Sequence, residues 1–311
     1  MTATDTELEA MAAALEASGR YRVLRKLGDR TQLSLPNGAA TRTGLFIDVE
    51  TTGLDTAHDE VIELALVPFT YGLDGQVFEI LPAYQAFQEP SRPIPPQITQ
   101  ITGITDAMVA GARIDLAKVE AIVAGCALVV AHNAAFDRRF AERISPAFET
   151  KPWACSMSQV DWAAEGHEGR KLGYLVAGAG YFYDAHRAAT DCQAAIELLA
   201  TPLPRSGVPA MARLLENARR PSWRIWAENS PYDLRNALKA RGYRWNGEGG
   251  PSPRAWYVDV EDDQRDTELQ YLRAEIYQRE IDLLVHAITA QNRFCDRVRS
   301  RSMATGVSDD E

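Results

Sequence analysis

Residues 45–54 read LFIDVETTGL, and two acidic residues stand at the end of an apolar run. The segment LFIDV is rich in residues that favour β-structure, which predicts a buried central strand. Side chains of a strand alternate between its two faces, so Asp48 and Glu50 point to the same face and lie close together. Two neighbouring carboxylates repel each other and raise each other's pKa. The site therefore either shares protons between the acids or binds a cation.

The composition describes a globular chain: 46% of its 311 residues are hydrophobic, and the length suits about two domains. The longest apolar run, at 121–131, is far shorter than the roughly 20 residues that span a membrane. Residues 2–19 contain four acidic residues and no basic one, unlike a signal or transit peptide. Four scattered cysteines favour a reducing compartment and neither a zinc site nor a disulfide framework. We expect a cytoplasmic protein without a membrane segment.

The charge is unevenly distributed along the chain. Its net value of −10 speaks against a protein that coats nucleic acid electrostatically. Residues 1–217 carry 18 Lys and Arg against 27 Asp and Glu, whereas residues 218–300 carry 14 against 13. An acidic N-terminal part is compatible with an enzyme that acts on phosphates if divalent cations supply the missing positive charge.

The hydrophobic pattern predicts an α/β fold, a mixed β-sheet covered by helices. An amphipathic helix is expected at 4–18. Strands are expected at 44–50, roughly 60–70 and 75–82, with a short Gly-containing loop that makes neighbouring strands antiparallel. The elements that follow are a helix at 115–124, a strand at 127–131, a helix from about 133 to 143, a strand at 153–155, and helices at 170–178 and 187–200.

After residue 201 the hydrophobic pattern predicts shorter elements. A Pro- and Gly-rich stretch opens a linker at 202–222 that includes a short helix. Residues 223–277 predict a small α+β module, in the order strand, helix, strand, strand, helix. A C-terminal helix is predicted at 278–300, followed by a disordered tail at 301–311. The N-terminal helix and lead-in segment at 1–41 and a central domain at 42–201 complete the division.

Two further segments place polar residues next to buried elements. AHNAAFD (131–137) begins where a predicted strand ends, and HRAATD (186–191) leads into a predicted helix. Taken alone, each segment has a simpler explanation. An acid pair at a strand end is usually solvated, and a His-Asn pair at a helix start is usually a cap. An acid on the flank of a helix is usually a surface residue. Their joint occurrence favours a site, because ligands bind at strand ends in open α/β sheets. Their oxygen ligands suit Mg²⁺ or Mn²⁺.

Together, FIDVETTGL, AHNAAFD and HRAATD resemble the three motifs of the DEDDh exonucleases, a group of the RNase H-like superfamily. That group includes the proofreading epsilon subunit of bacterial DNA polymerase III and RNase T. The resemblance covers roughly 42–201 and includes ITQITGIT at 98–105, between the first two motifs. It implies an RNase H-like mixed sheet flanked by helices, with an extra C-terminal module in this chain. The five motif residues would be Asp48, Glu50, Asp137, Asp191 and His186.

These five residues suit phosphodiester hydrolysis. The reaction adds negative charge in the transition state, and two cations about 3.5–4 Å apart can hold the attacking and leaving oxygens. We expect Asp48 to bridge two Mg²⁺ or Mn²⁺ ions, Glu50 and Asp191 to complete one site, and Asp137 to serve the other. His186 is the candidate general base, because its ordinary pKa of about 6.5 suits proton removal from water near neutral pH. The alternative for His186 is a helix-capping or core histidine.

The resemblance also implies two walls that contact the 3′-terminal nucleotide. The first wall would consist of Thr51, Thr52, Gly53 and Leu54. The second wall would consist of His132, Asn133 and Phe136. Phe136 could equally be a core residue.

Basic residues also occur among aromatic ones in the C-terminal module. Around a predicted hairpin the sequence gathers Arg244, Trp245, Arg254, Trp256 and Tyr257. This composition suits single-stranded nucleic acid, since rings stack on bases and arginines contact phosphates. Alternatively, the tryptophans form the core of a small module. The pair Arg138-Arg139 could contact phosphates, but we interpret it as a solvated helix face.

The sequence therefore predicts a metal-dependent 3′→5′ exonuclease that releases nucleoside 5′-monophosphates from the 3′ ends of single-stranded DNA. The same chemistry on RNA is the first alternative, because no residue indicates recognition of a 2′-hydroxyl. A non-catalytic nucleic-acid-binding or polymerase-associated module is the second, and the intact set of five residues argues against it. A polymerase or repair partner and a stand-alone enzyme are both compatible with the sequence.

Overall fold

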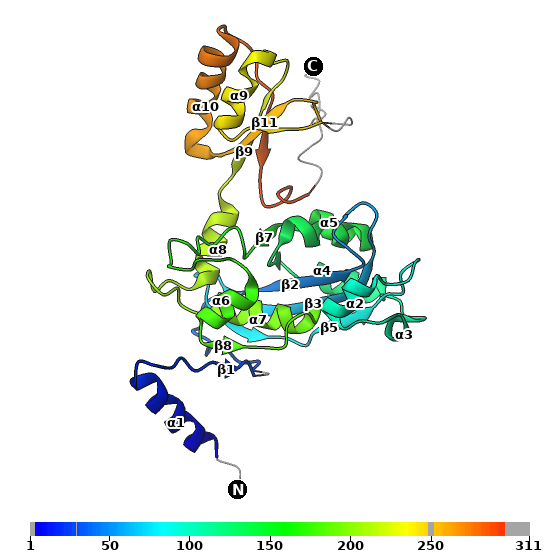
Figure 1. The fold of residues 1–311 in the computed structure, drawn as a ribbon, viewed down its shortest axis with the longest axis vertical. Coiled ribbons are helices and arrows are strands. Elements are labelled where there is room, and N and C mark those ends of the chain that lie inside the picture. Colours follow the sequence, from blue (N-terminus) through cyan, green and yellow to red (C-terminus); the bar gives the residue numbers. More distant parts are fainter. Residues whose placement is uncertain (1–3, 29, 248–251, 296–311) are drawn as a thin grey trace.

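The computed structural model describes residues 4–28, 30–247 and 252–295, which form a larger, sheet-centred part and a smaller part beside it (Figure 1). Helix α1 (Asp5–Ala17) lies apart from both, as the dark blue helix near the N-terminus. Thr4 and Glu7 form a capping box that fixes where this helix begins. The helix predicted at 4–18 is therefore present.

A six-stranded mixed sheet forms the centre of the larger part. Its order is β4-β3-β2-β6-β7, and β5 also pairs with β3. The strands are β2 (Thr41–Thr51), β3 (Val61–Gly72), β4 (Val77–Ile80), β5 (Tyr84–Phe87), β6 (Leu128–Ala131) and β7 (Trp153–Cys155). Strand β2 is antiparallel to β3 and parallel to β6, and β6 is parallel to β7. The predicted mixed sheet is confirmed, and residues 45–54 run along its central strand and into the turn that follows.

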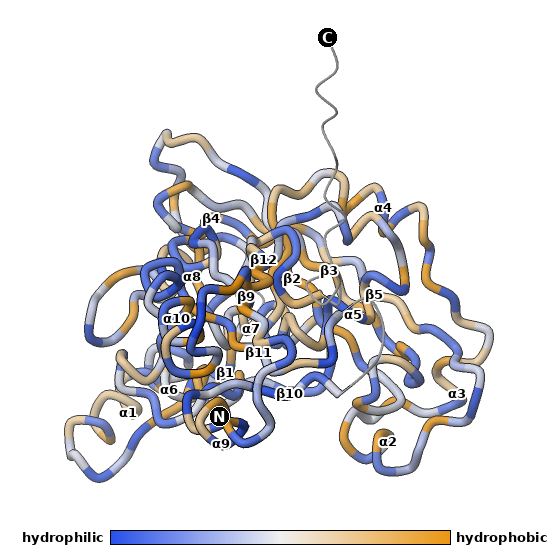
Figure 2. Tube along the Cα trace, turned by 90° about the horizontal axis from the view of Figure 1, so that it is seen from above, coloured by the Kyte–Doolittle hydropathy of each residue, from blue (hydrophilic) through white to orange (hydrophobic). Residues whose placement is uncertain are grey.

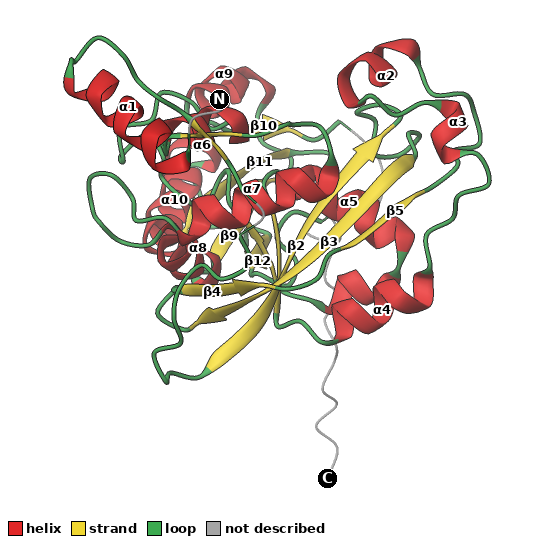
Figure 3. Cartoon of the chain, turned by 90° about the horizontal axis from the view of Figure 1, so that it is seen from below, coloured by secondary structure: helices red, strands yellow, loops and turns green. Residues whose placement is uncertain are grey.

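Helices cover both faces of this sheet (Figure 3). They are α2 (Pro96–Thr102), α3 (Asp106–Val109), α4 (Leu116–Ala124), α5 (Ala134–Ile144), α6 (Leu172–Gly178), α7 (Ala188–Ala200) and α8 (Ala210–Arg219). Phe46 points into a core shared with Leu199 of α7, while Leu45 and Ile47 join the core on the other side, with Phe140 of α5. Because strand side chains alternate, Asp48 and Glu50 continue the Phe46 face, which α7 covers.

Helix α8 lies within the predicted linker but packs as part of the larger core. Met211 and Leu214 are fully buried in the same cluster as Leu199. An isolated bridge between Pro202 and Pro209 closes the loop that precedes the helix. The segment between the two parts is therefore held against the sheet domain up to the end of α8.

The smaller part is an antiparallel sheet with helices on one face. Its order is β10-β11-β9-β12, from β9 (Ser222–Ala227), β10 (Arg244–Trp245), β11 (Trp256–Glu261) and β12 (Val285–Ile288). Helices α9 (Arg235–Ala240) and α10 (Arg265–Tyr271), the latter extended by a π-helical turn at Leu272–Tyr277, share a core with Ile225. The predicted α+β module and its hairpin, β10 with β11, are present.

The helix predicted at 278–300 is wrong over the described residues 278–295. Gln278 adopts a left-handed backbone (φ 51°) and ends the preceding helix. Strand β12 then pairs with β9, so the apolar residues of this segment alternate across an edge strand. Residues 296–311, with the rest of that helix and the predicted disordered tail, lie outside the described residues.

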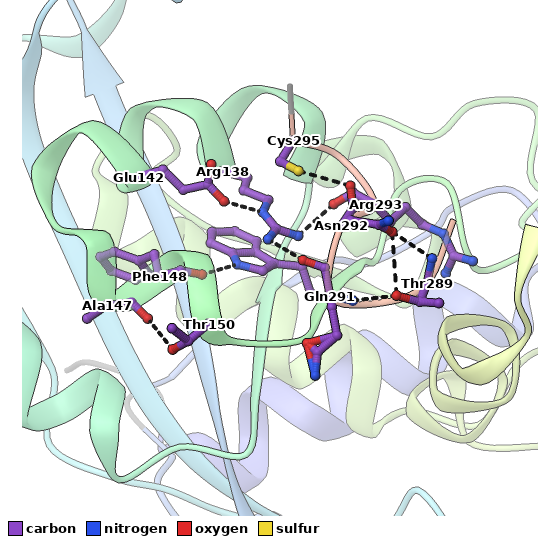
Figure 4. A network of polar contacts seen from close by, with 11 residues as sticks. Arg138, Glu142, Ala147, Phe148, Thr150, Thr289, Gln291, Asn292, Arg293 and Cys295 are labelled. Atoms are coloured by element: carbon purple, nitrogen blue, oxygen red, sulfur yellow. Dashed lines mark hydrogen bonds and ion pairs between the residues drawn. The ribbon is translucent and has the colours of Figure 1, made fainter. Parts of the chain in front are cut away.

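After β12 the chain returns to the larger part, as Figure 4 shows. The backbone N–H of Trp153 in β7 donates to the carbonyl of Ala290 at 2.7 Å. The guanidinium of Arg138 donates to the carbonyls of Gln291 (2.6 Å) and Arg293 (2.7 Å) and to Glu142 (2.7 Å). Arg138 is fully buried, so its interpretation as a solvated residue is wrong. We call the returning residues 289–295 the C-terminal return.

Figure 2 shows hydrophobic segments gathered near β2, β3 and β12, in the middle of the view. Strands β2 and β3 belong to the large sheet, and β12 belongs to the small one. Within the described parts of the chain, no helix has the length and apolar character needed to cross a membrane.

Candidate active site

Three of the predicted acids meet at the end of the central strand. Asp48 and Glu50 come from β2 and Asp191 from the first turn of α7, and carboxylate oxygens of all three lie within 4.8 Å of one another. The antiparallel register of β2 and β3 shifts between Glu50 and Thr51, so regular pairing is interrupted directly after the acids. The alternation predicted for Asp48 and Glu50 is thus present, and α7 supplies the third carboxylate.

The Asp191 carboxylate is oriented by two donors. The Tyr183 hydroxyl donates to one oxygen at 2.9 Å, and the backbone N–H of Arg187 donates to the other at 3.1 Å. The second bond spans four residues at the start of α7, so it also fixes the helix N-terminus. Tyr183 was not among the sequence-predicted site residues. Nothing in the sequence marks this tyrosine, which precedes the HRAATD motif, as a site residue.

Asp137 lies in the first turn of α5 and is 3% exposed. Burial raises the pKa of Asp137 to about 7, although hydrogen bonds from backbone groups, including that of Val49, act in the opposite direction. It lies outside the set of three acids whose oxygens are mutually within 4.8 Å. The structure therefore brings Asp137 next to the cluster without making it a member.

The acid cluster carries unbalanced negative charge. Burial, followed by the charges of Asp137, Asp191 and Glu50, raises the pKa of Asp48 well above its ordinary range. Burial, with the charges of Asp191 and Glu63, raises the pKa of Glu50 to about 7. Crowded carboxylate oxygens of this kind are the ligands that Mg²⁺ and Mn²⁺ prefer. The donor set therefore fits divalent cations.

His186 lies outside the cluster, on the exposed turn before α7. Its backbone is left-handed (φ 67°), which is uncommon for a residue other than glycine. Its charge lowers the pKa of Asp191, so the two side chains interact electrostatically. Strained residues cluster at functional sites, and the two residues directly after His186 donate hydrogen bonds to Glu63.

Glu63 is a fifth acid that sequence analysis missed. It stands opposite Glu50 across the β2–β3 pair and has no exposed surface. Its carboxylate accepts hydrogen bonds from Arg187 Nη2 (3.0 Å), the backbone N–H of Ala188 (3.2 Å) and Gln85 Nε2 (2.6 Å). Glu63 therefore ties β3 to the residues directly after His186. Its one sequence signal is an acid inside an apolar strand, VIELALV.

The first predicted wall forms a tight turn after β2. The Thr51 hydroxyl donates to the Gly53 carbonyl at 2.6 Å, and that of Thr52 to Asp59 at 2.9 Å. A Cβ at Gly53 would lie 2.4 Å from the Asp59 carboxylate, so this glycine makes room for Asp59 inside the turn. Leu54 is 84% exposed at its tip. Of this wall, Leu54 is the side chain left most accessible to a ligand.

The second predicted wall is largely engaged within the protein. His132 Nε2 donates to the carbonyl of Arg170 at 2.7 Å, so Nδ1 accepts from the Ser156 hydroxyl at 2.9 Å. Phe136 is half-buried and packs against Phe140, with ring centroids 4.9 Å apart. Asn133 is exposed at the N-cap position of α5, and its side chain makes no capping bond.

Comparison with known proteins identifies the family of this domain. Residues 45–199 match the family model described as Exonuclease. With the acid cluster, this shows that residues 45–199 are an exonuclease domain of the DEDDh group in the RNase H-like superfamily.

Sequence relatives include bacterial DNA polymerases. The chain is 40% identical over 100 residues to the PolC-type DNA polymerase III of Bacillus subtilis, which covers 32% of this chain and 6% of the polymerase. It is 33% identical over 133 residues to the PolC-type enzyme of Thermotoga petrophila, which covers 42% of this chain and 9% of that enzyme. The matches thus span a small fraction of these polymerases.

Solved structures that match part of this chain include Exonuclease X in complex with 5′ overhanging duplex DNA. It is 28% identical, with a TM-score of 0.41, and the match covers 55% of this chain and 99% of that one. E. coli Exonuclease I in complex with a dA16 oligonucleotide is 16% identical, with a TM-score of 0.47, covering 76% and 68% respectively.

Proposed function

We propose that this chain is a metal-dependent 3′→5′ exonuclease that removes nucleoside 5′-monophosphates from single-stranded DNA. The observation that carries the proposal is the cluster of Asp48, Glu50 and Asp191 at the end of β2, inside an exonuclease-family domain. In this proposal residues 42–201 are the catalytic domain, and residues 223–277 are an accessory module.

The acids would hold two Mg²⁺ or Mn²⁺ ions. Asp48 would be shared between them, with Glu50 and Asp191 at one and Asp137 at the other. The bound ions would stabilise negative charge on the attacking and leaving oxygens of an in-line displacement. The pKa values of Glu50 and Asp137 are both raised to about 7, by burial first and by neighbouring acids second. Bound cations would offset both effects, which supports this assignment.

His186 would act as the general base. Its imidazole would accept a proton from the attacking water as the water oxygen bonds to phosphorus. The bond between phosphorus and the 3′-oxygen of the penultimate nucleotide would break, and that oxygen would receive a proton from solvent. The products are a nucleoside 5′-monophosphate and a strand shortened by one nucleotide. Exposure of His186 and its proximity to Asp191 support this role.

The substrate contacts are proposed from both walls. The turn at Thr51–Leu54 would meet the terminal nucleotide, chiefly through exposed Leu54. On the other wall, Asn133 is accessible and Phe136 could present a ring face, while both nitrogens of His132 are already used. The relatives are DNA polymerases, which supports DNA over RNA as substrate and leaves a polymerase or repair partner as part of the proposal.

A labelled-strand assay tests both chemistry and polarity. The full chain is incubated with single-stranded DNA or RNA of equal sequence, in Mg²⁺, Mn²⁺ or EDTA. A 5′ label should yield a ladder of shortening strands, and a 3′ label should appear at once as mononucleotide. EDTA should abolish both signals.

The matched control is Asp48→Asn, which keeps side-chain size but removes one charge. It should be inactive while its circular dichroism spectrum is unchanged. Degradation of RNA alone would overturn the substrate assignment, release of the 5′ label as mononucleotide would overturn the polarity, and no metal-dependent turnover on either strand would overturn the function.

A further inference from the structure

The accessory module contains an aromatic pocket that the catalytic proposal does not use. It has a volume of about 340 Å³ and lies at the edge of the small sheet. Trp245 of β10 and Trp256 of β11 are directly paired across the hairpin, with ring centroids 5.7 Å apart, and both line it. Tyr232, from the segment after β9, lines it too and is 75% exposed, and Trp245 is 52% exposed. The module buries Trp226 but leaves these two large rings exposed. Exposed rings gathered in this way indicate a ligand-binding surface.

Two arginines add positive charge to this pocket. Arg235 lies over the Tyr232 ring at 4.0 Å, and Arg254 is exposed on the pocket lining. No carboxylate forms an ion pair with either one among the residues that the structure describes. The other arginines of the module differ.

Arg224 and Arg244 both pair with Asp259, and Arg241 pairs with Glu268. Each of these three is thus engaged with a carboxylate of the module, and two of them share one. Among the described residues, Arg235 and Arg254 therefore differ from these three arginines in lying beside the exposed rings without an ion pair.

The sequence grouped Arg244, Trp245, Arg254, Trp256 and Tyr257 as one cluster, and the structure separates them. Successive side chains of β11 point to opposite faces, so Trp256 and Tyr257 cannot share a surface. Tyr257 packs under Arg224 and beside Trp226, away from the pocket. Trp245, Trp256 and Arg254 stay together at the pocket.

We propose that this pocket binds single-stranded DNA. A base would stack on Tyr232 or Trp245, and Arg235 and Arg254 would contact the phosphates on either side. Stacking tolerates any base because every base has a π-face, which suits an enzyme that degrades strands without regard to sequence. A proline-rich peptide could also fit exposed aromatic rings, but it offers no anion to these two arginines, which have no ion pair among the described residues. The inference rests on the proposed function for its choice of ligand.

Binding is measured without catalysis, so that the pocket and the nuclease are tested separately. Fluorescence anisotropy of a labelled oligo-dT of about 20 nucleotides, several site sizes long, is recorded with the full chain in EDTA. Tyr232→Ala and Arg235→Ala should each raise the Kd by about 5- to 100-fold, the range seen when one stacking residue is removed. Trp emission should be quenched by the oligonucleotide, and Trp245→Phe should remove most of that quenching.

Arg265→Ala is the matched control, because Arg265 also lies over an aromatic ring, that of Trp223 (4.7 Å), but outside the pocket and next to Asp266. It should leave Kd unchanged. A Kd that is equal in all variants, or that rises as much in the control, would overturn the proposal, as would a proline-rich peptide that binds tightly while oligo-dT does not.

The kinetic consequence links the pocket to the nuclease. In Mg²⁺, the pocket variants should raise KM for a long strand while kcat stays unchanged, and KM for a strand of about 4 nucleotides should not change. An inactive chain that still binds oligo-dT through the pocket would contradict the proposed nuclease and leave the pocket intact. An active chain with unaltered KM in every variant would contradict the pocket alone.

Discussion

At the scale of single residues, the site divides into acids held rigidly and a histidine held loosely. Asp137 is buried in a helix, and Asp191 is fixed by Tyr183 and by a backbone N–H. His186 is exposed on a turn with a left-handed backbone. A base that must first receive a proton and then release it to solvent benefits from such exposure, whereas metal ligands need fixed geometry.

His186→Ala should lower kcat by about 10²- to 10⁴-fold, the usual contribution of a general base. Substrate affinity should be unchanged, because the proposed role concerns the attacking water. The measurement is kcat and KM on single-stranded DNA at saturating Mg²⁺. Asp184→Ala, an exposed neighbour on the same turn, is the control and should retain activity. Wild-type kcat in His186→Ala would contradict the role.

Asp48→Asn should raise the melting temperature in EDTA while it abolishes turnover. Asp48 is crowded by Asp137, Asp191 and Glu50, so loss of its charge relieves repulsion. Each kcal/mol of repulsion that is relieved should raise the melting temperature by about 2–4 °C for a domain of this size. Differential scanning fluorimetry with and without Mg²⁺ checks this, and the gain should shrink or reverse when Mg²⁺ is added. An unchanged melting temperature in EDTA would argue against a repulsive cluster.

The same cluster sets a pH dependence of stability in EDTA. The pKa is raised from 4.5 to about 7 for Glu50 and from 3.8 to about 7 for Asp137. The folded chain therefore holds protons that the unfolded chain releases at the same pH. Their contribution to the free energy of unfolding should fall as pH rises from about 4 to about 7 and stay level above that. Urea unfolding at a series of pH values measures it.

At the scale of elements, Glu63 connects three elements, one of which lies more than 100 residues away in the sequence. It joins β3, β5 and the start of α7 through Arg187, Ala188 and Gln85. The turn that carries His186 ends at this contact. Glu63 is therefore a positioning residue that acts through the α7 N-terminus.

Glu63→Gln should lower kcat by about tenfold or more with little change in KM, because small displacements of a catalytic group reduce rates steeply. Arg187→Ala should have a similar effect, and the double variant should be no worse than the stronger single one, since both act through one contact. Steady-state kinetics of the three variants measure this. Additive losses, or a loss expressed in KM alone, would contradict the positioning role.

The contact of α5 with the C-terminal return predicts a stability effect. Arg138 is fully buried, pairs with Glu142 and lies 5.3 Å from the Trp153 ring. Arg138→Met should lower the free energy of unfolding by about 3–5 kcal/mol, because it removes a buried charge that donates hydrogen bonds to the partly buried Glu142 and to two backbone carbonyls. Urea unfolding measures the loss. Arg213→Met, in the half-exposed pair with Glu216, should leave stability nearly unchanged.

At the scale of the whole molecule, the sequence predicted what depends on short-range patterns. Strand β2 and helix α7 follow from apolar periodicity, and the acids at their ends follow from three motifs. The pattern could not reveal the roles of Glu63 or Arg138, because each also contacts residues more than 100 positions away. It also mistook β12 for a helix, since an edge strand that pairs with β9 depends on a distant partner rather than on its own periodicity.

The C-terminal return gives the accessory module a second attachment to the exonuclease domain. The module enters through α8, which is packed in the core, and leaves through residues 289–295, which hydrogen-bond to β7 and Arg138. A body hinged at two points can swing about one axis, whereas a body on a single tether can tumble in all directions. Deletion of everything after residue 220 would therefore strip the β7 edge and Arg138 of their partners, so a lower activity of that truncated protein would report damage to the nuclease as well as loss of the module. Point substitutions in the module leave both hinges in place.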